Sequence, residues 1–281
     1  MDPAVLRRLV RAALEEDLGS GDVTSEVVVP GAAAARGRIV AREPLVVAGL
    51  EAAEAVFAET DAALRFRAVC ADGEQRSPGA LLARVEGRAR SILAGERTAL
   101  NFLQRGSGIA THARRLAERA RGTGTEIADT RKTAPGLRAF DKHAVRAGGA
   151  VNHRMGLFDA VLIKDNHWRL AGGIGPALRA ARTAREAGRL PGPIAIEVGT
   201  PAEVAEALTH GADALLLDNM EPPALEAAVR SARGRAFLEV SGSVREADLP
   251  RLLALGVQRI SIGALTHSVV AADIALEIEP L

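Results

Sequence analysis

Short apolar runs alternate with amphipathic segments in the part of the chain that begins near residue 125. The runs are rich in Ile, Leu and Val, and the segments between them carry apolar residues at the spacing of a helix. Such alternation predicts a parallel sheet covered by helices, and six runs in about 150 residues favour a barrel over an open sheet. The predicted strands are 126–128, 161–163, 194–196, 215–217, 237–238 and 260–262, and the predicted helices are 176–187, 201–210, 223–233 and 246–255.

Proline and glycine mark the ends of these predicted helices. Pro201 and Pro223 stand at early helical positions, where the missing backbone N–H costs nothing. Glycines at the far ends suit helix stops; they are Gly188, Gly211, Gly234 and Gly256.

The first part of the chain has a different pattern. Residues 3–16 place apolar side chains on one face of a helix, which ends at the glycines near residue 20. Residues 36–90 read as short strands, and the alternation over 64–70 suits a sheet with one face in water. A long helix is expected from about Ser91, interrupted near Gly106 and Gly108. These elements predict an α+β domain ahead of the parallel sheet.

Composition excludes several classes of protein. The formal net charge is +1, with 36 basic and 35 acidic residues, so no overall basic field indicates nucleic-acid binding. The longest stretch without charge, 260–272, is too short to span a bilayer, and charges interrupt the first segment. We therefore expect a cytoplasmic protein without membrane or nucleic-acid partners. A single cysteine, Cys70, excludes an internal disulfide and reads as packing.

Lysine is rare and confined to one window. Only Lys132, Lys142 and Lys164 occur among the 36 basic residues, while arginine supplies the rest. Some of these positions are therefore expected to need a compact ammonium group that arginine cannot imitate. His143, His153 and His167 lie in or just beyond the same window; without an HxH or HExxH spacing they are read as structural histidines and not as a metal site.

Polar residues follow nearly every predicted strand of the second part. Because the carboxyl ends of parallel strands converge on one rim, these residues predict a site. Its cations suit a polyanion, its two carboxylates suit sugar hydroxyls or hydrated Mg²⁺, and its Ser-Gly turns suit phosphate. The cations are Arg131, Lys132, Arg138, Arg154 and Lys164; the carboxylates are Glu197 and Asp218; the turns are 241–243 and 261–263.

Two other polar features have simple structural interpretations. A polar stripe at helical spacing is typical of a solvated helix face; it consists of Arg97, Asn101, Gln104 and Arg105. Asp22 follows a helix end and is expected to be a cap.

Several longer motifs resemble the quinolinate phosphoribosyltransferase family. The most specific series is DTRKTAPGLR at 129–138, NHR at 152–154 and LIKDNH at 162–167. Further similar segments extend the resemblance almost from end to end; they lie at 16–19, 21–24, 95–101, 107–111 and 261–268.

The resemblance implies an α/β protein with an N-terminal α/β sandwich domain and an incomplete parallel α/β barrel. The expected domains are 1–110, joined by the C-terminal tail 271–281, and a catalytic barrel over 111–270. It also implies a pentosyltransferase of de novo NAD biosynthesis, which converts quinolinate and phosphoribosyl pyrophosphate into nicotinate mononucleotide, pyrophosphate and CO2 with Mg²⁺. A homodimer is implied in which Arg97 completes the neighbouring site.

The resemblance also assigns roles to residues by their position in the motifs. The implied reaction requires no catalytic nucleophile. Arg97, Arg131, His153 and Arg154 match residues that hold the quinolinate carboxylates. Lys132 and Lys164 match residues that face both substrates. Glu197 and Asp218 match carboxylates near the ribose and the metal, and both would bind the metal through water. Ser241, Gly242 and Gly263 match the phosphate-binding strand ends. Lys132, Lys164, Glu197 and Asp218 are the residues expected to act in catalysis.

Three positions depart from the family pattern. Gly199 stands where a second glutamate is usual, residues 238–243 depart from Glu-Ala-Ser-Gly-Gly, and Val257-Gln258-Arg259 lacks an aspartate after Gly-Val. Metal, ribose and phosphate contacts are expected to differ there.

Three rival functions are kept open. One is the related protein of molybdenum-transport operons, against which the complete carboxylate clamp argues. The second is a Schiff-base lyase with Lys164 as nucleophile. The third is an anion-binding module without catalysis.

Overall fold

The computed structural model describes residues 1–190 and 192–281 of the 281-residue chain. Its contacts divide the chain into two compact units, which are described separately below. The first unit comprises Met1–Arg115, Thr133–Gly149 and Leu265–Leu281, and the second comprises Leu116–Lys132 and Ala150–Ala264. The domain boundaries expected from the sequence stay a prediction, because compactness does not establish which part folds on its own.

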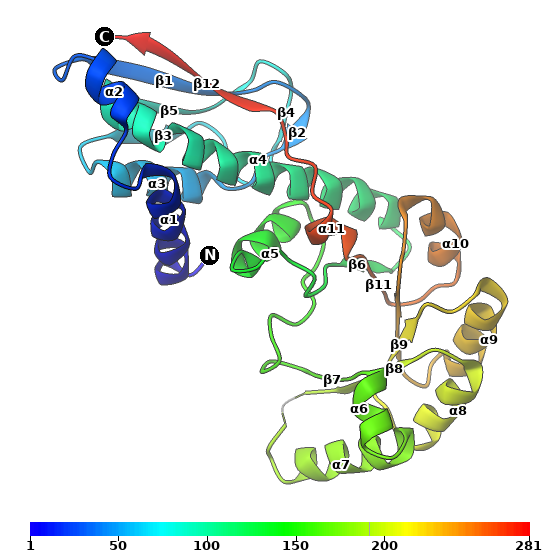
Figure 1. Ribbon diagram of the computed structural model, residues 1–281. Coiled ribbons are helices and arrows are strands. Elements are labelled where there is room, and N and C mark those ends of the chain that lie inside the picture. Colours follow the sequence, from blue (N-terminus) through cyan, green and yellow to red (C-terminus); the bar gives the residue numbers. More distant parts are fainter. Residues whose placement is uncertain (191) are drawn as a thin grey trace. The chain divides into compact units, whose positions relative to one another are not determined.

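A four-stranded antiparallel sheet organises the first unit. Its strand order is β12-β1-β5-β3, and the last strand of the chain pairs with the first, so that Ala35 faces Pro280 and Ala41 faces Ile274 (Figure 1). The strands are β1 (Ala34–Ala41), β3 (Arg65–Ala68), β5 (Leu81–Arg88) and β12 (Ile274–Pro280), with a separate pair β2 (Leu45–Val46) and β4 (Gln75–Arg76).

Helices bury their apolar faces in a core shared with this sheet. The first predicted helix extends over Pro3–Leu18, and Leu6, Val10 and Leu14 on its apolar face are buried as expected. Phe57 and Ile39 belong to the same core. The helices are α1 (Pro3–Leu18), α2 (Val23–Val28), α3 (Leu50–Thr60), α5 (Arg138–Ala147) and part of α4 (Ala89–Ala120), and the short α11 (Ala264–His267) spans the division between the units. Asp22 caps α2, as predicted, by accepting the N–H groups of Thr24 and Ser25.

The prediction that the long helix is interrupted is wrong. Helix α4 runs unbroken through Gly106 and Gly108. A Cβ atom at Gly106 would come within 2.5 Å of the Ala48 carbonyl oxygen, and one at Gly108 within 2.1 Å of the Val270 carbonyl oxygen. The glycines therefore allow neighbouring backbone to approach the helix, and this packing outweighs their low helix propensity of about 1 kcal/mol.

A partly buried carboxylate, that of Asp72, fixes the start of α3. Asp72 accepts the N–H groups of Gly49 (2.9 Å) and Leu50 (3.2 Å), and its Oδ2 lies 2.9 Å from Nε2 of His143 on α5. Burial raises the pKa of Asp72, but the hydrogen bonds from His143 and the two backbone N–H groups outweigh it and hold the pKa below its usual value.

Asp72→Asn should lower the free energy of unfolding by about 1–2 kcal/mol at pH 7, because the charged acceptor is lost. A lowered folded-state pKa stabilises the fold above the unfolded pKa of about 3.9, and this contribution is lost as the pH falls through the folded value. The deficit of the variant should therefore shrink below about pH 4 in urea titrations. Asp273→Asn, at an exposed position, is the control. If the variant lost the same free energy of unfolding at pH 7 and below pH 4, the lowered pKa assigned to Asp72 would be contradicted.

Six parallel strands form the sheet of the second unit. Their order is β6-β11-β10-β9-β8-β7, with β6 and β7 at its two ends and no pairing between those ends among the described residues. The strands are β6 (Glu126–Ala128), β7 (Val161–Ile163), β8 (Ile194–Val198), β9 (Ala214–Asp218), β10 (Phe237–Ser241) and β11 (Arg259–Ser261). The predicted α/β class and the parallel sheet of the second part are confirmed.

Helices connect these strands, as predicted. Pro201 begins its helix, and the four glycines expected at helix stops have left-handed backbone with φ of 67–77°. The connecting helices are α6 (Asp165–Leu170), α7 (Ile174–Glu186), α8 (Pro201–Thr209), α9 (Pro222–Ala232) and α10 (Leu249–Ala254), the last preceded by a 3-10 turn, η1 (Glu246–Asp248) (Figure 1). Across the ranges 1–190 and 192–281, none of the helices has the length and apolar character needed to cross a membrane.

Candidate active site

The predicted site residues of the second unit lie at one edge of its sheet. The carboxyl ends of the six parallel strands meet at this edge. The positions at these ends are Arg131 and Lys132 after β6, Lys164 after β7, Glu197 in β8, Asp218 at the end of β9, Ser241 at the end of β10 and Gly263 after β11. Residues far apart in the sequence are thus gathered at one edge and not scattered over separate surfaces.

Strand register places the carboxylates on one face of the sheet. Glu197 pairs with Leu216, and Leu216 pairs with Glu239, so the two glutamates are level across three strands. Asp218 lies two residues after Leu216 in β9, where it pairs with Ser241. Side chains two residues apart in a strand share a face, so Asp218 is on the same face as the two glutamates. This face therefore presents three carboxylates beneath the polar strand ends.

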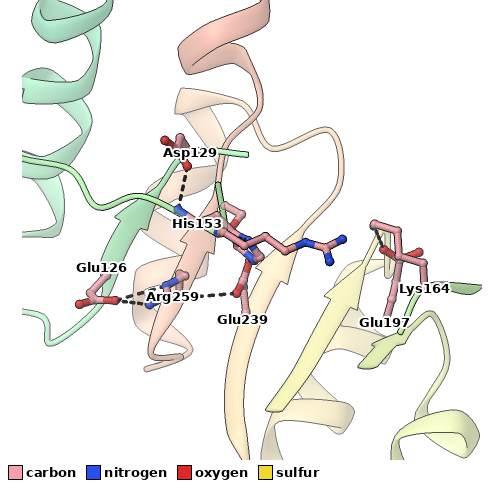
Figure 2. A network of polar contacts seen from close by, with 9 residues as sticks. Glu126, Asp129, His153, Lys164, Glu197, Glu239 and Arg259 are labelled. Atoms are coloured by element: carbon pink, nitrogen blue, oxygen red, sulfur yellow. Dashed lines mark hydrogen bonds and ion pairs between the residues drawn. The ribbon is translucent and has the colours of Figure 1, made fainter. Parts of the chain in front are cut away.

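Lys164 and Glu197 form an ion pair at this edge. Nζ of Lys164 contacts Oε2 of Glu197, and both side chains point toward each other from neighbouring strands (Figure 2). The Lys164 side chain is 45% exposed and that of Glu197 is 11% exposed. Trp168 on α6 donates from Nε1 to the Glu197 carbonyl at 3.2 Å. The lysine ammonium is thus held at the rim, where an anionic substrate can reach it.

His153 is held by hydrogen bonds to both ring nitrogens. Nδ1 accepts the N–H of Arg154 at 2.8 Å, so the ring proton lies on Nε2, which faces Oε1 of Glu239 at 3.3 Å. The backbone N–H of His153 donates to Asp129 at 2.7 Å (Figure 2). Asp129 is fully buried and also accepts from Asn152. These bonds fix the His-Arg dipeptide at the end of β6.

Glu239 is one of the polar residues at the predicted strand ends, but neither the pattern nor the family motifs assign it a role in the site. It is buried in β10 and accepts from the Ser261 hydroxyl as well as from His153. Burial raises its pKa, but His153, Ser261 and the Arg259 charge outweigh this and lower the pKa below its usual value. Arg259 extends the network to Glu126 at 2.9 Å (Figure 2). An acidic residue inside an apolar strand was the sequence signal, because a buried carboxylate needs partners.

Arg131 and Arg154 contribute two guanidinium groups to the cationic part of the edge. Burial, followed by the nearby charge of Arg131, lowers the pKa of Arg154, and Asp159 opposes this effect. Arg154 also donates from Nη1 to the Ala160 carbonyl at 3.1 Å. Guanidinium groups form paired hydrogen bonds with carboxylate and phosphate oxygens, so this part of the edge is chemically suited to such a ligand.

The turns after β9 and β10 need unusual backbone. Asn219 has φ of 50° and donates its N–H to the Ser241 carbonyl, and Gly242 has φ of 95°. A Cβ atom at Gly242 would lie 2.4 Å from Oδ1 of Asn219, so only glycine fits there. Ser243, where glycine is usual in the family motif, has φ of 48°. A cavity of about 300 Å³ adjoins these turns, with Asn219, Ser241, Gly242 and Ser243 in its lining.

The carboxylates offer few direct metal ligands. Within 1–190 and 192–281, no three His, Cys, Asp or Glu residues are grouped as a metal site. Asp218 accepts from the Asn219 amide, and Glu197 holds Lys164. At Gly199 a Cβ would meet its nearest atoms at 3.8 Å, so packing would allow a side chain. Two carboxylates suit Mg²⁺ that keeps most of its waters.

The polar stripe of α4 is not one solvated face. Arg97 and Asn101 are exposed, but Gln104 donates to the Ile274 carbonyl at 2.8 Å, and Arg105 is bound to the buried Asp141. The solvated-face reading is therefore wrong for Gln104 and Arg105. Arg97 belongs to the first unit, and so does Arg138, whose Nε donates to Thr133.

Comparison with known proteins gives consistent matches. The C-terminal domain model of quinolinate phosphoribosyl transferase matches residues 109–277, and the N-terminal domain model matches residues 22–107. A "Quinolinate phosphoribosyltransferase [decarboxylating] 1b" of Nicotiana tabacum is 41% identical over 98% of this chain and 82% of its own length. A "Probable nicotinate-nucleotide pyrophosphorylase [carboxylating]" of Bacillus subtilis is 36% identical over 99% of this chain and 95% of its own.

Solved structures agree with these matches. The nicotinate-nucleotide pyrophosphorylase of Francisella tularensis superposes with a TM-score of 0.93 at 35% identity, covering 99% of this chain and 98% of that one. NadC of Streptococcus pyogenes gives 0.92 at 34% identity over 100% and 99% of the two chains. The resemblance seen in the sequence motifs is confirmed over both parts of the chain. The chain belongs to the quinolinate phosphoribosyltransferase family.

Proposed function

We propose that this protein transfers the phosphoribosyl group of phosphoribosyl pyrophosphate to quinolinate. The products are nicotinate mononucleotide, pyrophosphate and CO2, as in de novo NAD biosynthesis. The observation that carries the proposal is the gathering of Arg131, Lys164, Glu197 and Asp218 at one edge of a parallel sheet. That edge combines paired guanidinium groups for a dicarboxylate with carboxylates for a ribose.

The arginines are assigned to the quinolinate carboxylates. Quinolinate carries two adjacent carboxylates, and bidentate guanidinium contacts both bind and orient them. Arg131 and Arg154 lie close enough for one charge to lower the pKa of the other guanidinium. His153 supports this clamp, because its ring is fixed between the Arg154 N–H and Glu239. The clamp thereby sets the direction of the ring nitrogen.

The lysines and carboxylates are assigned to the transfer. The ring nitrogen donates its electron pair to C1 of the ribose, and the C1–O bond breaks with its electrons passing to pyrophosphate. Positive charge builds on the ribose, which Glu197 and Asp218 stabilise, while Lys132 and Lys164 stabilise the leaving group. Gly242, Ser241 and Gly263 then hold the ribose phosphate through backbone N–H groups.

Decarboxylation follows from the new bond. The ribosylated ring nitrogen is cationic, so the bond from C2 to its carboxylate breaks with its electron pair remaining on C2, where the adjacent positive charge stabilises it. A proton then takes the place of the carboxylate at C2, and CO2 leaves. No enzyme nucleophile is needed at any step.

Mg²⁺ is part of this proposal. Glu197 and Asp218 would hold it through its waters, and the ion would neutralise pyrophosphate charge. The pair of carboxylates on neighbouring strands fits such a hydrated ion. Removal of divalent cations should abolish turnover, and added Mg²⁺ should restore it.

Pyrophosphate release tests the reaction and separates the rivals. We expect release with quinolinate and no release with nicotinate or without an acceptor. The relative from molybdenum-transport operons would not need quinolinate, and a binding module would release nothing. A Schiff-base lyase would be trapped covalently at Lys164 by borohydride with a carbonyl substrate, whereas this mechanism predicts no trapping.

A homodimer with shared sites is the proposed assembly, in which exposed Arg97 reaches the partner's site. Arg97→Ala and Lys164→Ala should each be nearly inactive as pure proteins. After subunit exchange in an equal mixture, about a quarter of the sites would be intact, so about a quarter of wild-type activity should return. Turnover is measured before and after mixing.

The control is a mixture of Lys164→Ala with Asp218→Asn. Both lesions lie in the second unit, so exchange would leave each affected site with one of them and should restore nothing. Failure of the Arg97→Ala mixture to recover, with subunit exchange verified by mass spectrometry, would contradict the shared site.

A further inference from the structure

A partly buried ion pair joins two helices of the first unit. Arg105 on α4 donates from Nε and Nη2 to the two carboxylate oxygens of Asp141 on α5, each at 2.8 Å. Asp141 is fully buried, and the Arg105 side chain is 26% exposed. Such a two-point contact fixes both position and angle, which a single charge contact cannot do.

Each member of the pair also holds a second segment of the first unit. Oδ2 of Asp141 accepts the N–H of Ala134 at 3.3 Å, and Nη2 of Arg105 lies 3.4 Å from the Thr266 carbonyl oxygen. Ala134 lies two residues after Lys132, and Thr266 lies three residues after Gly263. One ion pair therefore holds the chain just beyond two proposed substrate-binding positions.

The helices around the pair are packed too closely to shift easily. The rings of Phe102 and Phe140 meet edge-to-face with their centroids 5.2 Å apart. Phe102 lies three residues before Arg105, and Phe140 lies directly before Asp141. Gly106 brings α4 against the Ala48 carbonyl and the Phe140 ring. The ion pair thus lies on two closely packed helices, and its bonds to Ala134 and Thr266 join two further segments to these helices.

Stability alone does not account for such a pair. A well-packed apolar pair of similar size is often as stable as a buried ion pair, because desolvation offsets the attraction between the charges. What an apolar pair cannot do is bind an N–H group and a carbonyl oxygen at defined places. The second bonds of Arg105 and Asp141 do this.

We propose that Arg105 and Asp141 are positioning residues that fix the segments 133–137 and 264–267, which directly follow Lys132 and Gly263 in the chain. The inference rests on the proposed function for its kinetic consequence, because Lys132 serves quinolinate and pyrophosphate and Gly263 serves the phosphate. Neither residue is assigned contact with a substrate. Their effect on the reaction passes through the segments 133–137 and 264–267.

Arg105→Lys is the most informative variant. It keeps the positive charge beside Asp141, but a single ammonium lacks the planar fork that spans both carboxylate oxygens and the Thr266 carbonyl. The fold should survive with a thermal midpoint close to wild type. We expect faster amide hydrogen exchange in 133–137 and 264–267, and a rise in KM for phosphoribosyl pyrophosphate that exceeds any fall in kcat. The expected loss in kcat/KM is about 10- to 100-fold.

Arg38→Lys is the matched control, because its ion pair with Glu277 at 3.2 Å lies in the same unit but is partly exposed. This control should leave exchange in both segments and both KM values unchanged. Asp141→Asn is the second test variant and should raise exchange in 133–137, where Ala134 loses its charged acceptor.

The two readouts separate this inference from the function. If wild type turns over quinolinate but Arg105→Lys leaves both KM values and the exchange of both segments unchanged, the positioning role is wrong while the function stands. If wild type does not turn over quinolinate, the proposed function fails, and unchanged exchange in Arg105→Lys would still overturn the positioning role independently. Faster exchange confined to the two segments supports it in either case.

Discussion

Arg131→Ala is expected to lower kcat/KM for quinolinate by about 10²- to 10³-fold while leaving the fold intact. Truncating one partner of a desolvated, hydrogen-bonded charge pair typically costs about 2–5 kcal/mol, and each 1.4 kcal/mol is a factor of ten. The charge of Arg131 acts on Arg154, and the loss of Arg131 removes one of the two guanidinium groups that are proposed to hold the quinolinate carboxylates. Steady-state kinetics with each substrate varied in turn measures the effect.

The loss should fall mainly on quinolinate. The KM for phosphoribosyl pyrophosphate should change far less, because Lys132, Lys164 and the strand-end turns hold that substrate. Arg230→Ala is the control, since Arg230 on α9 is largely exposed and pairs only loosely with Glu226 at 3.8 Å. Turnover of Arg131→Ala equal to that of the control would remove the clamp from the account.

Lys164→Ala is expected to lower kcat by about 10²- to 10³-fold. In the proposed mechanism the lysine ammonium offsets charge that develops on the departing pyrophosphate, so its contribution is expected to be largest in the transition state. Its removal also leaves the mostly buried Glu197 carboxylate without its cation. Single-turnover measurements with saturating substrates separate this effect from weaker binding.

Lys164→Arg tests whether charge alone suffices. Arginine keeps the charge but brings a larger planar group, so we expect partial recovery and not wild-type turnover. The thermal midpoint should change little in Lys164→Arg, because a cation stays beside the Glu197 carboxylate. A kcat near wild type in Lys164→Ala would contradict the role of the lysine.

The strands and helices of the second unit could be predicted because their signals are local. A short apolar run such as Val161-Leu162-Ile163 favours a strand buried on both faces, and Pro201 favours the first turn of a helix. The strand-end residues followed from the same pattern, since parallel strands put their carboxyl ends on one edge. Family motifs then attached roles to these positions.

Long-range packing could not be predicted in the same way. Glycine normally weakens a helix, and only the approach of the Ala48 carbonyl explains why α4 continues through Gly106. Arg105 and Arg97 occupy similar positions in the polar stripe, yet Asp141 on another helix makes one of them an ion-pair partner. No spacing within α4 identifies that partner.

Glu239 is an intermediate case. An acidic residue within the strand Phe237–Ser241 signals a buried carboxylate, but its partners come from β11 and from the segment between α5 and β7. The sequence therefore indicated the position, and only the structure identifies the connection to His153. Such a connection matters because it fixes the ring that supports the arginine clamp.

Mass-spectrometric detection of nicotinate mononucleotide is the most direct test of the central claim that this sheet edge holds a pyridine dicarboxylate against an activated ribose. The purified protein is incubated with phosphoribosyl pyrophosphate, Mg²⁺ and quinolinate labelled with ¹³C in the 2-carboxylate, with nicotinate as the control acceptor. We predict unlabelled nicotinate mononucleotide together with labelled CO2 from quinolinate, and no mononucleotide from nicotinate. Equal product from nicotinate, or none from quinolinate, would contradict the account.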